Sequence, residues 1–411
     1  MAKSSKKSNK RSNSVVMENV SRFTKNPIQS SIDLFDSYFL HQSPLFYRLA
    51  MLIVLMLGCG LIMVLSASNV VSIKATGDAF AEFRSQAIFA VLGLIVMIFI
   101  SMRKVALIQW FSILFLSFSV GLQFLVMVPG IGVTVGGNTN WIGFGGFTFQ
   151  PSELVKLGII LALAAKLSPN IDELWDWRMG AKPLVLYGLL PAGIVFATSE
   201  DLGTTLVIVA FVVLLGYLIG MPAKHIGTIL GSGVVLFLIF ALSNQNRTRR
   251  ILAFLGQSEA GTDINWQVEH GTWALASGGI FGTGLGDSKM KWGWIPEVEN
   301  DFIFSIVGEE VGLLGATIVI IFFFMLARYI RRVSLNSTTT FGAIALTGIM
   351  VWLTLQAVIN IAVVLGLFPV IGVPLPLFSK GGSSMLAVLM ALGVVLAVER
   401  DQARPRKVRK K

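Results

Sequence analysis

Long uninterrupted apolar runs constrain this chain more than any other feature of its sequence. The run from Leu52 to Leu65 reads LIVLMLGCGLIMVL, which is apolar on every face and does not alternate as a barrel strand would. Backbone amides in hydrocarbon must pair internally, and only helices and closed barrels achieve this. Similar runs recur along a chain that is 54% hydrophobic and only 13% charged. The sequence therefore predicts an all-α polytopic membrane protein.

The number and direction of the spans follow from the apolar runs and from the charges between them. A membrane helix needs about 20 apolar residues, and about ten runs qualify. The predicted spans are 48–68, 86–102, 105–128, 151–167, 183–199, 203–221, 225–243, 302–328, 342–367 and 382–398. Lys and Arg gather in alternate connections, such as Arg103-Lys104, 166–182 and 328–332, whereas 129–150 contains neither. The positive-inside rule then places both termini in the cytoplasm and the long loop 244–301, between helices 7 and 8, outside.

The net charge of +11 resides mainly in two tails. Residues 1–44 and 400–411 are basic and are expected to be largely disordered and cytoplasmic, flanking a transmembrane domain at 45–399. Attraction to anionic membrane lipid explains such tails, so a nucleic-acid partner is not expected. The single cysteine, Cys59, lies in an apolar run and excludes a disulfide or a cysteine metal site within the chain.

Ionisable residues at the outer ends of the predicted spans need a partner or a polar interior. Glu153 and Lys156 are three residues apart, which favours a structural ion pair. Asp301 precedes the eighth span, where a helix cap and a catalytic carboxylate are equally compatible with its position. Glu310 lies about 13 Å deeper along the helix, which favours an internal ion pair with a Lys or Arg of a neighbouring helix.

Two glycine-rich stretches allow a functional and a packing interpretation. No predicted strand precedes Gly278–Gly286, so a dinucleotide-binding loop is excluded, and either an anion contact or close packing on helices remains. Residues 381–384, Gly-Gly-Ser-Ser, open a helix just after Lys380. A phosphate site is compatible with that arrangement, but close helix packing through small residues is favoured.

Short polar motifs recur in a fixed order along residues 45–400. They are Gly60–Ser68, Phe83–Gln86, Trp141–Gly143, Phe149–Lys156, Asp201–Thr204, Gly278–Lys289, Ile295–Glu297, Asp301–Phe304, Gly308–Glu310, Asn360, Gly366–Pro369 and Ser379–Ser384. In this order they resemble the SEDS family of bacterial cell-wall glycosyltransferases, which includes FtsW, RodA and SpoVE. The sequence departs from the family pattern at Asn140 (usually arginine), at Ser199-Glu200 (usually Gln-Pro) and at Lys380 (often tyrosine). The Ser-Ala-Ser at 66–68 and the Val-Pro-Leu-Pro-Leu run look more like the division branch, FtsW, than the elongation branch, RodA.

The resemblance implies a peptidoglycan glycosyltransferase that polymerises lipid II with inversion. The family's essential acidic residue maps onto Asp301, which would act as general base on the acceptor hydroxyl. Cations would stabilise the departing lipid pyrophosphate, and a divalent Mg²⁺ or Mn²⁺ is compatible with this role although no carboxylate cluster fixes one. Glu297 would either tune the basicity of Asp301 or hold the geometry of the loop. The candidate substrate-binding residues are Arg84, Lys289, Lys380, Lys156, Glu297, Ser288 and Ser383.

Two rival functions remain open at this point: a lipid II flippase and a non-catalytic divisome scaffold. The resemblance further implies a class B penicillin-binding protein transpeptidase and divisome regulators as partners. It places the protein in the bacterial cytoplasmic (inner) membrane, enriched at the division septum.

Overall fold

The computed structural model describes residues 42–135, 138–144, 147–242 and 263–403. The chain divides into a short unit, 1–44, and a main unit, 45–411, to which nearly all of the described residues belong. The predicted tail 1–44 lies almost entirely outside the described residues, so its expected disorder stays a prediction. Of the predicted tail 400–411, residues 400–403 belong to the last described helix, and the rest lie outside the described residues.

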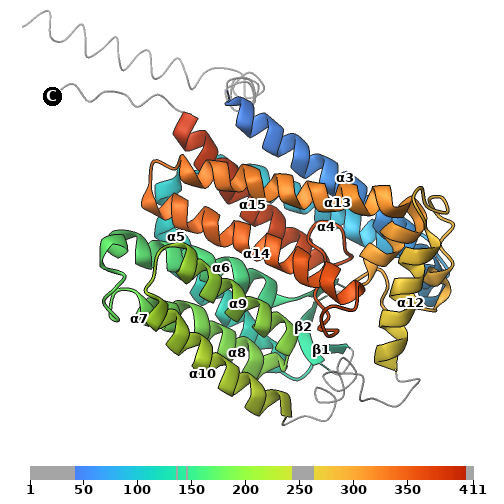
Figure 1. Cartoon of the computed structure of the whole chain (residues 1–411), viewed down its shortest axis with the longest axis horizontal. Helices are drawn as coiled ribbons and strands as arrows, with labels where there is room; N and C mark the ends of the chain where they lie inside the picture. Colours follow the sequence, from blue (N-terminus) through green and yellow to red (C-terminus); the bar gives the residue numbers. More distant parts are fainter. Residues whose placement is uncertain (1–41, 136–137, 145–146, 243–262, 404–411) are drawn as a thin grey trace, which may run out of the picture. The chain divides into compact units, whose positions relative to one another are not determined.

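Apolar helices dominate the main unit (Figure 1). Eight helical segments in the described part of the chain are long and apolar enough to cross a membrane. They are α3 (Pro44–Thr76), α4 (Ala81–Ser101), α5 (Val105–Phe124) with η1 (Leu125–Met127), α6 (Pro151–Leu167) with η2 (Ser168–Glu173), the run α7 (Ala181–Leu184), η3 (Val185–Leu189) and α8 (Leu190–Ser199), α13 (Ile303–Leu335), α14 (Thr340–Val364) and α15 (Gly382–Ala403). The shorter apolar helix α9 (Leu202–Leu218) and α10 (Ala223–Leu242) complete the series. Each predicted run coincides with one helical segment, which confirms the helical membrane fold, while the count of ten spans and the sidedness stay predictions.

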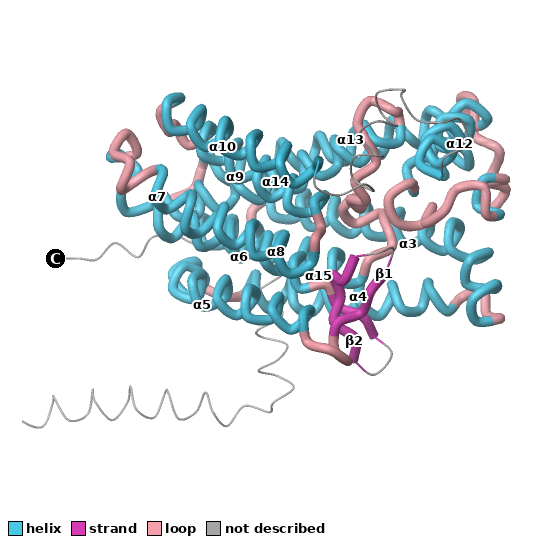
Figure 2. Tube along the Cα trace, turned by 90° about the horizontal axis from the view of Figure 1, so that it is seen from below, coloured by secondary structure: helices cyan, strands magenta, loops and turns pink. Residues whose placement is uncertain are grey.

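A small sheet interrupts the predicted all-helical pattern. Strands β1 (Gly132–Val135), β2 (Asn138–Phe144) and β3 (Phe147–Phe149) form an antiparallel sheet in the order β1-β2-β3. Figure 2 shows it in magenta. Val133, Thr134 and Val135 are β-branched, and aromatic residues follow in β2 and β3, which favours strands. The sequence interpretation treated 129–150 only as a cation-free connection and missed this sheet.

The predicted long loop 244–301 also has structure of its own. It contains α12 (Asp263–Ser277) and the short helix η4 (Met290–Trp292). Residues 243–262 lie outside the described residues. α12 packs on the turn before α13, because a Cβ at Gly271 would lie 3.0 Å from the Phe302 ring.

The glycine-rich loop 278–286 packs tightly against a break in α13. Gly312 has φ 71° and ψ −169°, which interrupts the helix and frees backbone groups on either side. The N–H groups of Thr283 and Gly284 donate to the Glu309 and Glu310 carbonyls at 2.9 and 3.1 Å. In return, the Leu313 and Leu314 N–H groups donate to Gly279 and Ile280 at 2.9 and 3.2 Å. Of the two interpretations, this loop therefore shows close packing, as non-helical backbone among apolar helices requires.

Basic residues gather where the ends of several helices meet. The Arg400 guanidinium donates to the Met102 and Arg103 carbonyls at 2.6 and 3.1 Å, and Gln402 donates to the Val333 carbonyl at 3.0 Å. These contacts bring the ends of α4, α13 and α15 together. The arrangement agrees with the charge alternation, which assigns these ends to one side of the membrane.

We expect Gly282→Ala to destabilise the fold more than Gly279→Ala does. Both glycines have left-handed backbone, with φ of +84° and +53°, so alanine strains each by about 1–2 kcal/mol. A Cβ at Gly282 would also lie 2.2 Å from the Glu310 carbonyl oxygen, whereas a Cβ at Gly279 meets nothing within 4 Å. Thermal unfolding of the purified protein in detergent measures the difference. Equal midpoints for the two variants would contradict the close packing of this loop.

Candidate active site

Asp301 lies in a turn that other elements hold in place. Asn360 of α14 is 1% exposed, and its side-chain nitrogen donates to the carbonyls of both Asp301 and Val373 at 2.8 Å. A Cβ at Gly372 would lie 4.0 Å from Asp301 Oδ2, so the α14–α15 loop closely approaches the carboxyl group. The N-cap position of α13 is Phe302, so Asp301 does not occupy the capping position. The backbone of Asp301 is therefore held at a loop junction one residue before the cap, its side chain is half-buried, and its role stays a prediction.

Lys380 joins two carboxylates beside this turn. Its ammonium lies 3.0 Å from Glu82 of α4 and 3.4 Å from Glu299, and its backbone N–H donates to the Glu299 carbonyl at 2.8 Å. Burial raises the pKa of Glu299, partly offset by the attraction of Lys380. Gln86 of α4 anchors the same loop, because its amide donates to Ser379 O at 3.2 Å and accepts from Gly381 N at 3.1 Å. Glu82 and Glu299 were not identified from sequence, and Gln86 appeared only as part of the motif Phe83–Gln86, without an assigned role.

Lys156 is held inside the bundle. It lies 2.8 Å from Glu153, and both side chains are 2% exposed, so the ion pair that the spacing favours is formed. Its ammonium also donates to Gln356 Oε1 at 3.0 Å and lies over the Trp352 ring at 5.1 Å. Gln356 in turn donates to the Pro374 carbonyl at 2.8 Å. These contacts give Lys156 a structural role, and its binding to substrate stays a prediction.

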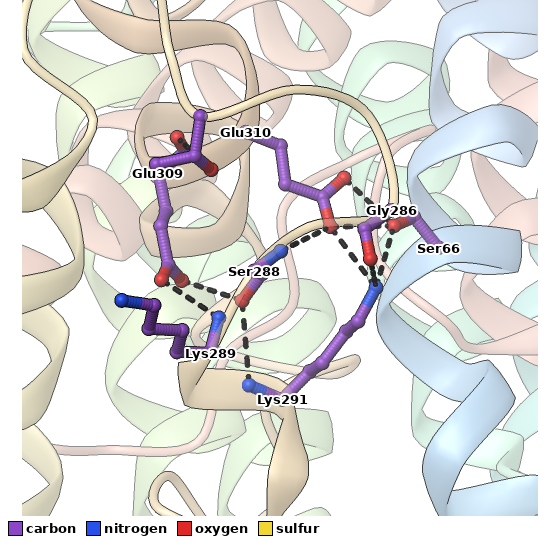
Figure 3. Close-up of polar contacts among 8 residues, drawn as sticks. Ser66, Gly286, Ser288, Lys289, Lys291, Glu309 and Glu310 are labelled. Carbon is purple, nitrogen blue, oxygen red and sulfur yellow. Dashed lines mark hydrogen bonds and ion pairs between the residues drawn. The ribbon is translucent and has the colours of Figure 1, made fainter.

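Glu310 forms an internal ion pair, shown in Figure 3. Its partner is Lys291 at 3.3 Å, with side chains 0% and 2% exposed. The expected partner was a Lys or Arg of a neighbouring helix, whereas Lys291 belongs to η4 in the loop, so that detail was wrong. Ser66 of α3 donates to both Glu310 oxygens at 2.6 and 2.7 Å. The network therefore ties α3, η4 and α13 together.

Glu309 binds the chain just before η4. Its carboxylate accepts from the Ser288 hydroxyl and, at 2.9 Å, from the Lys289 N–H (Figure 3). Ser288 is 1% exposed and fully engaged in this contact. The Lys289 side chain is exposed. The structure thus separates two neighbours that were both candidates for substrate binding.

The remaining candidates occupy different environments. Ser383 is 6% exposed and accepts from the Gln150 N–H at 2.8 Å, which is a structural contact. Arg84 pairs with Asp78 while its side chain stays 64% exposed. Glu297 is exposed, has φ 51°, and accepts a hydrogen bond from Asn300. A Cβ at Gly382 would lie 2.2 Å from the Phe89 ring, so close packing, the favoured interpretation, occurs at 381–384.

Asp201 caps α9 through contacts to Thr204, whose N–H donates at 2.9 Å and whose hydroxyl donates at 2.7 Å. Asn140 of β2 donates to the second Asp201 oxygen at 2.8 Å. Asn140, at the position where the family usually has arginine, therefore still makes a hydrogen bond to Asp201 but carries no positive charge.

The described residues do not form a ready-made site for a divalent metal. Among them, no group of three or more His, Cys, Asp and Glu side chains could hold a metal ion. The space between Glu82 and Glu299 is bridged by the Lys380 ammonium, which supplies the positive charge there. No catalytic step is therefore assigned to Mg²⁺ or Mn²⁺.

Comparison with known proteins places the whole membrane domain in one group. The family model described as "Cell cycle protein", covering FtsW, RodA and SpoVE, matches residues 47–404. A probable peptidoglycan glycosyltransferase FtsW of Trichlorobacter lovleyi is 34% identical over 85% of this chain and 92% of its own length. Stage V sporulation protein E of Bacillus subtilis is 36% identical over 86% of this chain and 96% of its own.

Solved structures share the fold. The rod shape determining protein RodA of Thermus thermophilus matches with a TM-score of 0.63 and 25% identity, over 87% of this chain and 98% of its own. A chain from a peptidoglycan synthase complex matches with a TM-score of 0.69 and 24% identity, over the same shares of the two chains. The helical arrangement is therefore common to these proteins.

The buried pair Lys291–Glu310 predicts a specific pattern of stability. Lys291→Met or Glu310→Gln alone leaves one buried charge without its counter-charge and should destabilise by about 3–5 kcal/mol. The double variant removes both charges and should recover most of the loss. Thermal unfolding in detergent measures each variant, with Lys104→Met as a control at an exposed lysine. Additive losses in the double variant would show that the two side chains do not interact.

Proposed function

The chain belongs to the FtsW, RodA and SpoVE family of cell cycle proteins, and on this premise we propose that it is a peptidoglycan glycosyltransferase. It polymerises lipid II into glycan strands, with inversion, and Asp301 is the general base. The observation that supports this role is the fixed position of Asp301. Asn360 holds its backbone carbonyl at 2.8 Å, and the backbone at Gly372 approaches its carboxylate, because a Cβ there would lie 4.0 Å from Oδ2.

The proposed step transfers one proton and one sugar chain. The Asp301 carboxylate accepts the proton of the acceptor's 4-hydroxyl as that oxygen attacks the anomeric carbon of the donor. The bond between this carbon and the pyrophosphate breaks on the opposite face, and the lipid pyrophosphate leaves with the electron pair.

The cations available to the leaving group differ in their freedom to bind it. Lys156 and Lys380 are each held by carboxylates, and Lys156 is buried. Lys289 and Arg84 have exposed side chains. We therefore assign pyrophosphate stabilisation first to Lys289 and Arg84. Arg84 must exchange Asp78 for the phosphate oxygens, which an exposed ion pair permits because it contributes little stability.

The cellular setting belongs to the same proposal. The chain acts in the division branch, in the bacterial cytoplasmic membrane and at the septum, beside a class B penicillin-binding protein that crosslinks its product. The likeness to FtsW relatives supports this branch. Divisome regulators are proposed as further partners. A RodA-like elongation role is the alternative, and septal or lateral localisation of the tagged protein distinguishes the two.

Polymerisation of labelled lipid II by the purified protein tests the proposal. Asp301→Asn should lower the rate by at least about 100-fold, the lower end of what a general base contributes, because an amide cannot accept the proton. Asp287→Asn makes the same chemical change at an exposed acid in the same segment and should leave the rate unchanged. Wild-type polymerisation by Asp301→Asn excludes this residue as the base. If the protein moves lipid II across vesicle membranes but forms no polymer, it is a flippase. If it shows neither activity, the scaffold function is the one that remains.

A further inference from the structure

Three elements distant in sequence meet at the Lys380 ammonium. Glu82 comes from the first turn of α4, Glu299 from the turn before α13, and Lys380 from the loop before α15. The ammonium lies 3.0 Å from Glu82 and 3.4 Å from Glu299. We call these three residues the Lys380 bridge. It is partly exposed at Lys380 and Glu82, whose side chains are 26% and 28% exposed, and buried at Glu299.

Glu299 is bound to Lys380 through both its side chain and its backbone. Besides the ion pair, the Lys380 N–H donates to the Glu299 carbonyl at 2.8 Å. Asp301 follows two residues later, and its own carbonyl is held by Asn360. The peptide that carries the carboxylate is thus fixed at both ends, once by Lys380 and once by α14. If the contact of Glu299 with Lys380 is lost, the turn can shift while Asn360 still holds the Asp301 carbonyl.

We propose that Glu299 and Lys380 are positioning residues for Asp301, acting through the Lys380 bridge rather than through contact with substrate. This inference rests on the proposed function of Asp301. Catalytic groups must be held close to their productive geometry, and a misplacement of about 1 Å can lower the rate about 100-fold. The Lys380 bridge meets that need because it connects α4, through Glu82, to the turn that carries Glu299 and Asp301.

The charges of the bridge distinguish this role from phosphate binding. Two carboxylates and one ammonium leave a net negative charge, which repels a pyrophosphate. To bind phosphate, Lys380 would have to leave Glu299, whose side chain is 3% exposed. A buried carboxylate without its counter-charge is strongly unfavourable. The structure therefore favours Lys380 as a permanent partner of Glu299.

The titration of Glu299 makes the pH dependence of kcat a second measurement of its role. The charged groups that act on it are Lys380 and, along its own segment, Glu297, with Glu82 on the other side of the ammonium. Burial raises the pKa of Glu299, so the ion pair is complete above that raised pKa and is lost as the pH falls through it. Activity of the wild type should therefore decline at low pH partly through Glu299.

Kinetics of lipid II polymerisation by the full chain test the inference, using Glu299→Gln, Lys380→Met, Lys380→Arg and the double variant Glu299→Gln/Lys380→Met. Each of the first two should lower kcat about 10- to 100-fold and change KM less than about threefold, because geometry rather than binding is lost. Lys380→Arg should retain most of the activity. The double variant should be no slower than the slower single variant, because both remove the same contact. Glu269→Gln removes an exposed acid on α12 and should match the wild type.

The pH profile separates positioning from a general loss of fold. In Glu299→Gln the acid limb of kcat should move to lower pH, because Glu299 no longer titrates. Equal thermal midpoints for the wild type and Glu299→Gln would assign the loss to geometry. A mainly raised KM in Lys380→Met would instead identify Lys380 as a substrate ligand and overturn the inference, as would wild-type kcat in Glu299→Gln. If Asp301→Asn is also fully active, the proposed function fails as well, so the two failures are distinguishable.

Discussion

The structure depends on one constraint: a polar group surrounded by apolar helices must find its partner inside the protein. Lys156 meets it with Glu153 and Gln356, and Glu310 meets it with Lys291 and Ser66. The contacts of Lys156 with Gln356 and of Glu310 with Ser66 join elements that are far apart in the sequence. Polar contacts, rather than apolar packing alone, therefore specify which helices stand next to one another.

The same constraint shapes the non-helical segments that build the candidate site. The α14–α15 loop passes between helices without backbone partners of a regular kind, so side chains satisfy it: Gln356 at Pro374, Asn360 at Val373 and Gln86 at Ser379. The glycine-rich loop 278–286 instead pairs with the backbone freed at Gly312. Both segments surround the turn of Asp301 or the helix it precedes. The candidate site is thus built from irregular backbone whose polar groups are satisfied by hydrogen bonds among apolar helices.

The sequence predicted the helices well because each apolar run is long enough to be recognised without knowledge of its neighbours. Spacing alone also identified the pair Glu153 and Lys156, since three residues place both on one helix face. It failed where partners come from distant segments. Nothing local indicates that Lys291 reaches Glu310, or that Lys380 reaches Glu82 and Glu299. The sheet β1–β3 was missed because short strands beside glycines resemble a loop.

For Asp301, the sequence identified the residue but did not determine its role. Its position before an apolar run left a cap and a catalyst equally compatible, and the resemblance to a family singled it out. The structure adds that Phe302 holds the capping position and that Asn360 fixes the turn, while the catalytic role of Asp301 stays a proposal. The neighbours that hold it, Glu299 and Asn360, could not be assigned a role from the sequence because their partners lie in segments that are distant along the chain.

The central claim is that the Asp301 turn faces the outer side of the membrane, where glycan strands are made. Cysteine labelling in intact cells tests it directly, with Cys59 replaced by alanine and a single cysteine placed at Glu269 of α12 or at Glu173 of η2, both exposed. A membrane-impermeant maleimide should label the cysteine at 269 in intact cells and the cysteine at 173 only after the membrane is opened. Labelling at 173 but not at 269 in intact cells would contradict the account.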